Sequence, residues 1–158
     1  MPTIEERLAR LEDERDILNL LYTYGHALDY GHEQAFMNCW TEDAYLEWTA
    51  RPASFRGRAE ILRAFREHSH APIARHKHLL IEPLIEIRGD EAEIVSMFAR
   101  LDSYGGLPKI RTFGRYLDRT RRCPDGRWRI TYRKAESDVM RREAPDVFSL
   151  SQDAEALD

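Results

Sequence analysis

The chain has 158 residues, of which 42% are hydrophobic, 33% are charged and 10% are aromatic. This length suits a single domain, and the composition excludes collagen-like, low-complexity and wholly disordered chains. The 24 basic and 28 acidic residues give a formal net charge of −4, which argues against nucleic acid as a partner. Ten Lys or Arg residues lie between positions 109 and 134, against two acidic ones, but strands that display arginine to solvent explain this bias.

Two further features narrow the class of protein. No stretch approaches the roughly 18 consecutive apolar residues that a membrane span needs, and the first ten residues are too charged for a secretory signal. Cys39 and Cys123 share no motif, so the sequence suggests neither a disulfide framework nor a thiolate zinc site. We therefore expect a soluble, cytoplasmic protein with no membrane partner.

A long first helix is predicted from residue 4 to residue 30. Thr3 can cap its N-terminus, because Glu6 follows three residues later in the capping-box arrangement. Apolar residues then recur at steps of three, four or seven as far as Leu28. Glycine takes the left-handed conformation at little cost, so the helix should end at Gly31.

Turn residues and apolar periodicity place the remaining elements. Two more helices are predicted, over residues 32–40 and 57–68, with a loop between them at 51–56. Strands are predicted over residues 45–49, 77–87, 92–101, 110–120 and from 128 onward, with turns at 89–90, 105–106 and 124–126. Most of the helices therefore come first, and most of the strands come last.

This order predicts an α+β fold rather than alternating βα units with a parallel sheet. We expect a curved antiparallel sheet that wraps around the N-terminal helices and forms a cone with an internal pocket. A single domain should cover residues 1–140. Residues 141–158 show no pattern and should form a frayed tail.

Four of the six histidines lie between positions 68 and 78, which raises the question of a metal site. His76 and His78 would face the same side of a strand and could bind one metal ion. With Glu82 and Gly89 they have the spacing HxH-x3-E-x6-G, which is similar to the first metal motif of the cupins. Three facts argue against a cupin site. Position 70 carries no glycine, no histidine follows His78, and a helical N-terminal third is foreign to the cupin fold. We therefore predict no metal.

Asp29 is the most informative single residue, because it ends the first helix on its apolar side, where an unpaired carboxylate is costly. It could turn out to solvent through the bend at Gly31, or it could pair with a histidine of the sheet, for which we choose His78. In such a pair the carboxylate fixes the imidazole tautomer and stabilises the imidazolium, so His78 becomes a general base. A phenol such as Tyr24 could bind the substrate oxygen on which charge grows, although an ideal helix brings Tyr22 closer to the Asp29 face.

Other polar residues have a simpler interpretation as solvated groups. His68 and His70 would lie at the end of the helix over 57–68, where a cation is mildly stabilising. Arg111 and Arg115 could bind an acidic group of a substrate if the strand register turned them inward, but we expect them to face solvent.

Four stretches together resemble a known family. They are LLYTYGHALDYG at 20–31, FRGRAEILRAF at 55–65, RHKHLLIEPLIEIRGDEAEI at 75–94 and GRYLDRTRRCPDGRWRITYR at 114–133. Their order and spacing resemble the SnoaL-like branch of the nuclear transport factor two superfamily, whose members include scytalone dehydratase and ketosteroid isomerase. The resemblance covers about residues 4–133 and implies a cone-shaped α+β fold.

The resemblance also implies roles for single residues. Tyr24, Asp29 and His78 match the tyrosine, aspartate and histidine of cofactor-free lyases in the family, among them scytalone dehydratase, a bile-acid dehydratase and a hexachlorocyclohexane dehydrochlorinase. Trp48 lies near the position at which related dehydratases carry an aromatic side chain that faces substrate. No histidine follows His78, so the second catalytic histidine of scytalone dehydratase, from a later strand, has no counterpart here.

We therefore expect a cofactor-independent dehydratase, related lyase or isomerase that acts on a small hydrophobic cyclic substrate. Tyr45, Tyr22 and Phe113 join Trp48 as candidate substrate-binding residues. Superfamily sheets often pair through their outer faces, so a homo-oligomer, either a dimer or a trimer, is expected. Three alternatives stay open: a non-catalytic protein that binds a hydrophobic ligand, a subunit similar to a dioxygenase β subunit, and a metal site on His76 and His78.

Overall fold

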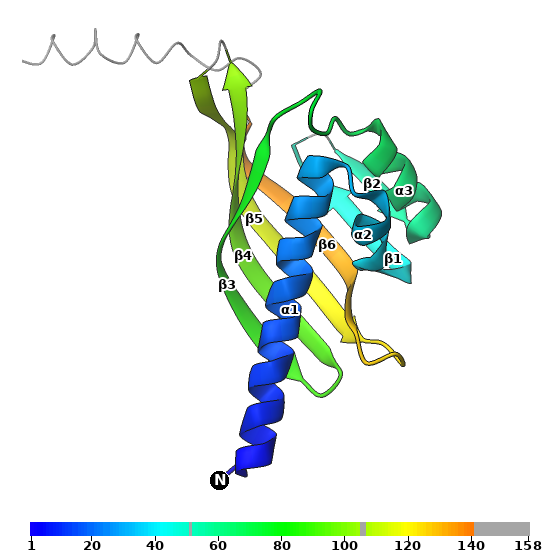
Figure 1. Ribbon diagram of the computed structural model, residues 1–158, viewed down its shortest axis with the longest axis vertical. Coiled ribbons are helices and arrows are strands. Elements are labelled where there is room, and N and C mark those ends of the chain that lie inside the picture. The colour runs from blue at the N-terminus through cyan, green and yellow to red at the C-terminus, as the bar shows by residue number, and fades with distance from the viewer. Residues whose placement is uncertain (51, 105–106, 141–158) are drawn as a thin grey trace, which may run out of the picture.

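The structure, a computed structural model, describes residues 1–50, 52–104 and 107–140 (Figure 1). Its helices are α1 (Ile4–Tyr30), α2 (Glu33–Asn38) and α3 (Gly57–Glu67). Its strands are β1 (Trp40–Trp48), β2 (Ala53–Arg56), β3 (Lys77–Arg88), β4 (Glu91–Tyr104), β5 (Leu107–Arg122) and β6 (Trp128–Met140). The predicted α+β class is confirmed. The predicted turn at 105–106 and the tail at 141–158 lie outside the described residues.

The strands form one six-stranded sheet in the order β2-β1-β6-β5-β4-β3. Every neighbouring pair is antiparallel except β1 and β6, which run parallel, so the expectation of a wholly antiparallel sheet was wrong at this pair. The reason is connectivity. A tight hairpin forces its two strands to be antiparallel, whereas β1 and β6 are joined only through α3 and four other strands. The sheet curves, and α1 lies across one of its faces (Figure 1).

α1 begins and ends where the sequence predicts. Thr3 and Glu6 form a capping box, and Gly31 adopts the left-handed conformation with φ 71° and donates its N–H to the carbonyl of Ala27. The first turns of the helix extend past the sheet (Figure 1), and its buried residues begin only at Ile17. The second half of α1 therefore carries its buried contacts with the sheet, and Asp13 in the first half adds polar contacts with Arg122 and Trp128.

The region after α1 differs from its prediction in two places. The helix predicted over 32–40 ends at Asn38, and the strand predicted over 45–49 already begins at Trp40. Most of the segment predicted as a loop at 51–56 is β2, which pairs with β1. Both errors have the same cause. Acidic residues and Pro52 lower the local strand propensity, but pairing with β6 and β1 supplies the hydrogen bonds. The turns predicted at 89–90 and 124–126 are present.

β3 contains a bulge at Glu82. The pairing register with β4 shifts between Ile81 and Leu84, and Glu82 has a φ of 47°, in the left-handed region. Side chains on the helix side of the strand lie at even positions before the bulge, as at Leu80, and at odd positions after it, as at Ile85. The bulge thus resets the alternation of the strand.

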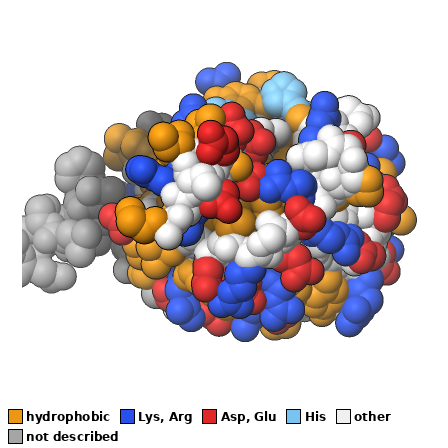
Figure 2. All heavy atoms as spheres, turned by 90° about the horizontal axis from the view of Figure 1, so that it is seen from below, with side chains coloured by type: hydrophobic (Ala, Val, Ile, Leu, Met, Phe, Trp, Pro, Cys, Tyr) orange, Lys and Arg blue, Asp and Glu red, His pale blue; other side chains and the backbone are white. Residues whose placement is uncertain are grey.

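The arginine-rich strands are balanced by acidic partners. Arg115, Arg119, Arg121, Arg122, Arg129 and Arg133 each form an ion pair with Asp or Glu. Seen from the end at which α1 begins, basic and acidic side chains are interspersed over the surface (Figure 2). Among the helices that the structure describes, none is both long and apolar enough to cross a membrane.

Candidate active site

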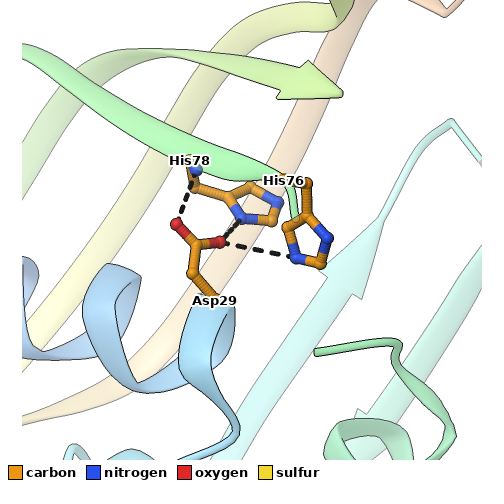
Figure 3. Close-up of side chains that lie close together, drawn as sticks. All are labelled: Asp29, His76 and His78. Carbon is orange, nitrogen blue, oxygen red and sulfur yellow. Dashed lines mark hydrogen bonds and ion pairs between the residues drawn. The ribbon is translucent and has the colours of Figure 1, made fainter. Parts of the chain in front are cut away.

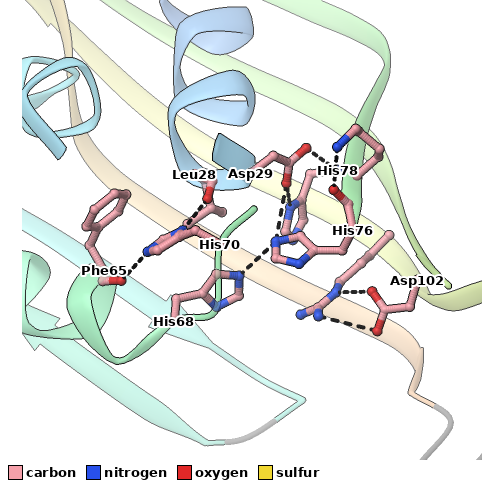
Figure 4. Close-up of polar contacts among 10 residues, drawn as sticks. Leu28, Asp29, Phe65, His68, His70, His76, His78 and Asp102 are labelled. Carbon is pink, nitrogen blue, oxygen red and sulfur yellow. Dashed lines mark hydrogen bonds and ion pairs between the residues drawn. The ribbon is translucent and has the colours of Figure 1, made fainter. Parts of the chain in front are cut away.

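The end of α1 is fastened to the segment that leads into β3. The backbone N–H of Ala71 donates to the carbonyl of Asp29 at 3.0 Å. The imidazole of His70 lies between two carbonyl oxygens, with Nδ1 2.5 Å from that of Leu28 and Nε2 2.9 Å from that of Phe65 (Figure 4). His70 is therefore a structural bridge between α1 and α3, and the expectation that it is a solvated residue was wrong.

Asp29 and His78 form a close pair at this junction (Figure 3). Asp29 is 3% exposed, its Oδ1 lies 2.6 Å from Nδ1 of His78, and its Oδ2 accepts the backbone N–H of His78 at 2.9 Å. The carboxylate thus holds both the backbone and the ring of His78. Because Nδ1 donates to the carboxylate, Nε2 carries the lone pair and is the basic nitrogen.

The pKa of Asp29 reflects two opposing effects. Burial raises it, but the hydrogen bonds from the His78 ring and backbone and the nearby imidazole charges lower it more, so the net pKa lies below the usual value. Asp29 therefore stays a carboxylate at neutral pH and can stabilise a positive charge on His78.

Two further histidines extend this pair into a cluster. His76 is 1% exposed, and its Nε2 lies 3.4 Å from Oδ1 of Asp29 and 3.3 Å from Nε2 of His68 (Figure 4). Burial, the Arg100 guanidinium and the neighbouring imidazoles lower the pKa of His76 to about 4 and that of His68 to about 3. Both rings are therefore neutral at neutral pH. The expectation that His68 is a solvated helix-end residue was also wrong.

A pocket of about 360 Å³ lies beside the cluster, between the three helices and the sheet. Its apolar wall includes Leu28, Phe36, Leu46, Trp48, Phe65 and Phe98. Its polar wall includes Tyr24, His68, His78, Arg100, Asp102 and Arg111. The volume is in the range of small-molecule sites, and the combination of a mainly apolar wall with a few polar groups is typical of them. Three of the predicted site residues, Tyr24, Trp48 and His78, meet in this pocket.

Tyr24 lies deep in the pocket, on the stripe of α1 that faces the sheet. Its ring packs 5.2 Å from Phe36 and 6.3 Å from Tyr116, and the Arg133 guanidinium lies 4.0 Å from its centre. Burial raises the pKa of Tyr24, and the charge of Arg133 only partly opposes this effect. The phenol is therefore protonated at neutral pH and can donate a hydrogen bond.

Three predicted substrate-binding residues lie elsewhere, outside the pocket wall given by the described residues. Tyr22 is 44% exposed, because the buried stripe of α1 runs through Tyr24 and not through its neighbour two positions back. Tyr45 packs against Tyr132, 5.8 Å away, since the alternation of β1 turns Leu46 inward. Phe113 is 45% exposed on the outer side of the sheet.

Arg100 and Asp102 line the pocket but were missed at the sequence level. The inward side of β4 alternates through Ser96 and Phe98 to Arg100, and this pattern was the available signal. Arg111 also lines the pocket, although we expected it to face solvent. Arg115 pairs with Glu136 at the surface, in keeping with the prediction.

The cluster also contains the atoms that a metal site would use. Oδ1 of Asp29 and ring nitrogens of His76 and His78 all lie within 4.8 Å of one another. The 2.6 Å contact between Asp29 and Nδ1 of His78 is the length of a charge-assisted hydrogen bond with a proton between the atoms. A metal that used Nδ1 of His78 would have to displace this proton, so the spacing at that nitrogen suits a proton better than an ion.

Comparisons with known proteins place this geometry in context. The model of the SnoaL-like domain matches residues 9–134. An NTF2-like protein with a cystatin-like fold from Novosphingobium aromaticivorans is 23% identical, with a TM-score of 0.77 over 95% of this chain and 97% of that one. LinA is 18% identical, with a TM-score of 0.75 over 89% and 95% of the two chains.

A second solved structure from Novosphingobium aromaticivorans bears the name of scytalone dehydratase. It is 19% identical, with a TM-score of 0.70 over 87% of this chain and 91% of that one. No protein among the curated sequences matches. At these identities the solved structures show that the fold is shared.

Proposed function

Because this chain belongs to the SnoaL-like domain family, we propose that it is a cofactor-independent lyase or isomerase for a small hydrophobic cyclic substrate. One observation carries the proposal. A buried carboxylate, Asp29, holds both the ring and the backbone of His78 at the wall of a largely apolar pocket. This arrangement is the one that a histidine general base requires.

In the proposed elimination, Nε2 of His78 takes a proton from a carbon of the substrate. The electron pair of the broken C–H bond forms a C=C bond, and the leaving group departs from the adjacent carbon with its own bonding pair. Asp29 stabilises the imidazolium that forms. When the leaving group is hydroxide, the imidazolium returns the proton to it, so water leaves and the base is restored. In an isomerisation the same proton returns to another carbon.

Tyr24 assists at the substrate oxygen. Its raised pKa keeps the phenol protonated, and its place in the pocket wall lets it donate to a leaving group or a carbonyl oxygen on which negative charge grows. The aromatic wall around it, including Trp48, would hold the ring of the substrate.

The test is a screen of candidate eliminations and isomerisations of cyclic compounds, followed by substitution in the active protein. His78→Gln and Asp29→Asn should each lower kcat/KM about 10²- to 10⁴-fold, the usual contribution of a positioned proton transfer. His26→Gln is the matched control, because His26 is an exposed histidine of α1. Circular dichroism checks that the variants fold. Undiminished turnover in both site variants would contradict the mechanism.

We also propose that copies of the chain associate through the outer side of the sheet. Leu84, Val95, Met97 and Phe113 are large apolar residues exposed on β3, β4 and β5, and Val95 lies directly opposite Leu84 in the strand pairing. Contiguous apolar surface of this kind marks interaction sites. Analytical ultracentrifugation should find a dimer or trimer that Val95→Glu dissociates and Ile73→Glu, in an exposed loop, does not. A wild-type monomer at tens of micromolar would contradict this proposal.

A further inference from the structure

Arg100 lies directly opposite His78 on the neighbouring strand. The two residues are partners in the register between β3 and β4, and both line the pocket. Side chains directly opposite each other in an antiparallel pair have Cβ atoms about 4.5–5.5 Å apart. The guanidinium and the basic imidazole therefore face the same part of the pocket.

Asp102 orients the guanidinium group of Arg100 through two of its three nitrogens, which leaves part of this forked group of donors unused by Asp102. Oδ1 of Asp102 accepts from Nε at 2.7 Å, and Oδ2 accepts from Nη2 at 3.3 Å. These two bonds fix one edge of the planar guanidinium, and Nη1 takes part in neither. A fork held in this way is prepared to bind an oxygen anion at its other edge, at a small cost in side-chain entropy.

The surroundings of Arg100 favour an anionic group beside it. The guanidinium contributes to the lowered pKa of both His68 and His76, so those imidazoles stay neutral and the positive charge beside them is that of Arg100. Asp102 offsets the charge of Arg100 in part, and a second oxygen anion would be bound mainly by the directed hydrogen bonds of the fork. The apolar wall of the pocket, with Phe36, Phe65 and other aromatic side chains, suits a ring.

We propose that the pocket takes a ring compound that carries an anionic oxygen, and that Arg100 binds this oxygen beside His78. The inference rests on the proposed function only for placing the reacting carbon next to His78. The oxygen has two possible sources. It belongs either to a carboxylate of the substrate or to a carbonyl whose oxygen receives the electron pair when His78 removes a proton from the neighbouring carbon, which forms an enolate.

Binding of three naphthalene probes tests the inference without any turnover. Isothermal titration calorimetry should show that 2-naphthoate binds the wild-type protein at least tenfold more tightly than 2-naphthamide, which is its neutral counterpart. Arg100→Gln should weaken 2-naphthoate binding about 10- to 100-fold, as expected for the loss of a charged hydrogen bond, and change 2-naphthamide binding less than threefold. Arg100→Lys should restore part of the loss. Arg115→Gln is the control, because Arg115 pairs with Glu136 at the surface.

The third probe, 2-naphthol, distinguishes the two sources of the oxygen. If Arg100 serves an enolate, bound 2-naphthol should show the red-shifted absorption of the naphtholate in the wild-type protein and lose it in Arg100→Gln. If Arg100 serves a substrate carboxylate, the dependence on Arg100 should appear with 2-naphthoate alone. The inference is overturned if neither probe responds to Arg100→Gln, or if 2-naphthoate does not bind the wild-type protein at millimolar concentration.

These measurements fail or succeed separately from the proposed function. Arg100-dependent binding in a protein whose turnover does not need His78 would leave the inference standing and remove the mechanism. Loss of turnover in His78→Gln together with probe binding that ignores Arg100 would do the reverse.

Discussion

The ion pair between Arg133 and Asp118 packs against the ring of Tyr24, which lines the pocket. Both side chains are fully buried, with Nε to Oδ1 at 2.7 Å and Nη2 to Oδ2 at 2.6 Å, and the guanidinium lies 4.0 Å from the centre of the Tyr24 ring and 4.3 Å from that of Tyr116. Burial would lower the pKa of Arg133, but the charge of Asp118 outweighs it and raises the pKa overall. The guanidinium is therefore always charged, and it depends on Asp118 for its counter-charge.

Removing that partner should be costly. Asp118→Asn leaves a buried cation without its counter-charge, so the free energy of unfolding should fall by about 3–5 kcal/mol, measured by urea denaturation. Glu93→Gln is the control, because the pair of Glu93 with Arg119 is long, at 3.8 Å, and exposed, and its loss should change the stability little. Replacing both buried partners, as Arg133→Met with Asp118→Leu, should recover much of the loss. An Asp118→Asn protein as stable as the wild type would contradict this account.

At the scale of single elements, local signals predicted the structure well wherever local chemistry decides it. The capping box at Thr3 and the left-handed Gly31 set both ends of α1, and the turn residues at 89–90 and 124–126 set the hairpins between β3 and β4 and between β5 and β6. What escaped prediction depends on distant partners. β2 is a strand because β1 lies beside it, and the direction of β6 relative to β1 is fixed by packing and not by a turn.

In the candidate active site, too, some contacts could be predicted from the sequence and others could not. The pairing of Asp29 with His78 was predictable, because a carboxylate on an apolar helix face needs a partner and few candidates exist. The roles of His68 and His70 were not, since both depend on how the segment after α3 folds back over the end of α1. Tyr24 was preferred on the family resemblance although an ideal helix favoured Tyr22, and the face of α1 that meets the sheet buries Tyr24 and leaves Tyr22 exposed.

For the whole molecule, the histidine cluster sets the response to acid. The pKa values of His68 and His76 in the folded protein are about 3 and 4, below the ordinary value of 6.5. When the pH falls through 6.5, the unfolded chain binds protons at these positions and the folded chain does not. The stability they contribute is therefore fully present above pH 6.5 and is lost as the pH falls towards 4. Each residue can steepen this loss by at most about 1.4 kcal/mol per pH unit.

Urea denaturation at pH 7.5, 6.0 and 5.0 measures this effect. His76→Leu removes one of the two groups, so its free energy of unfolding should fall less steeply with decreasing pH than that of the wild type, whatever its stability at pH 7.5. His26→Gln should keep the wild-type slope, because His26 is exposed on α1. A slope in His76→Leu equal to that of the wild type would show that the cluster does not govern acid stability.

The bulge in β3 makes the inward-facing positions of its two halves independent of each other. Before Glu82 the strand presents His78 to the pocket, and after it the strand presents Ile85 and Ile87 to the interior beneath α1. Because the alternation restarts between them, neither half dictates which residues the other must turn inward. Evolution or protein engineering can therefore substitute pocket residues at one end of this strand while the hydrophobic packing at the other end is unchanged.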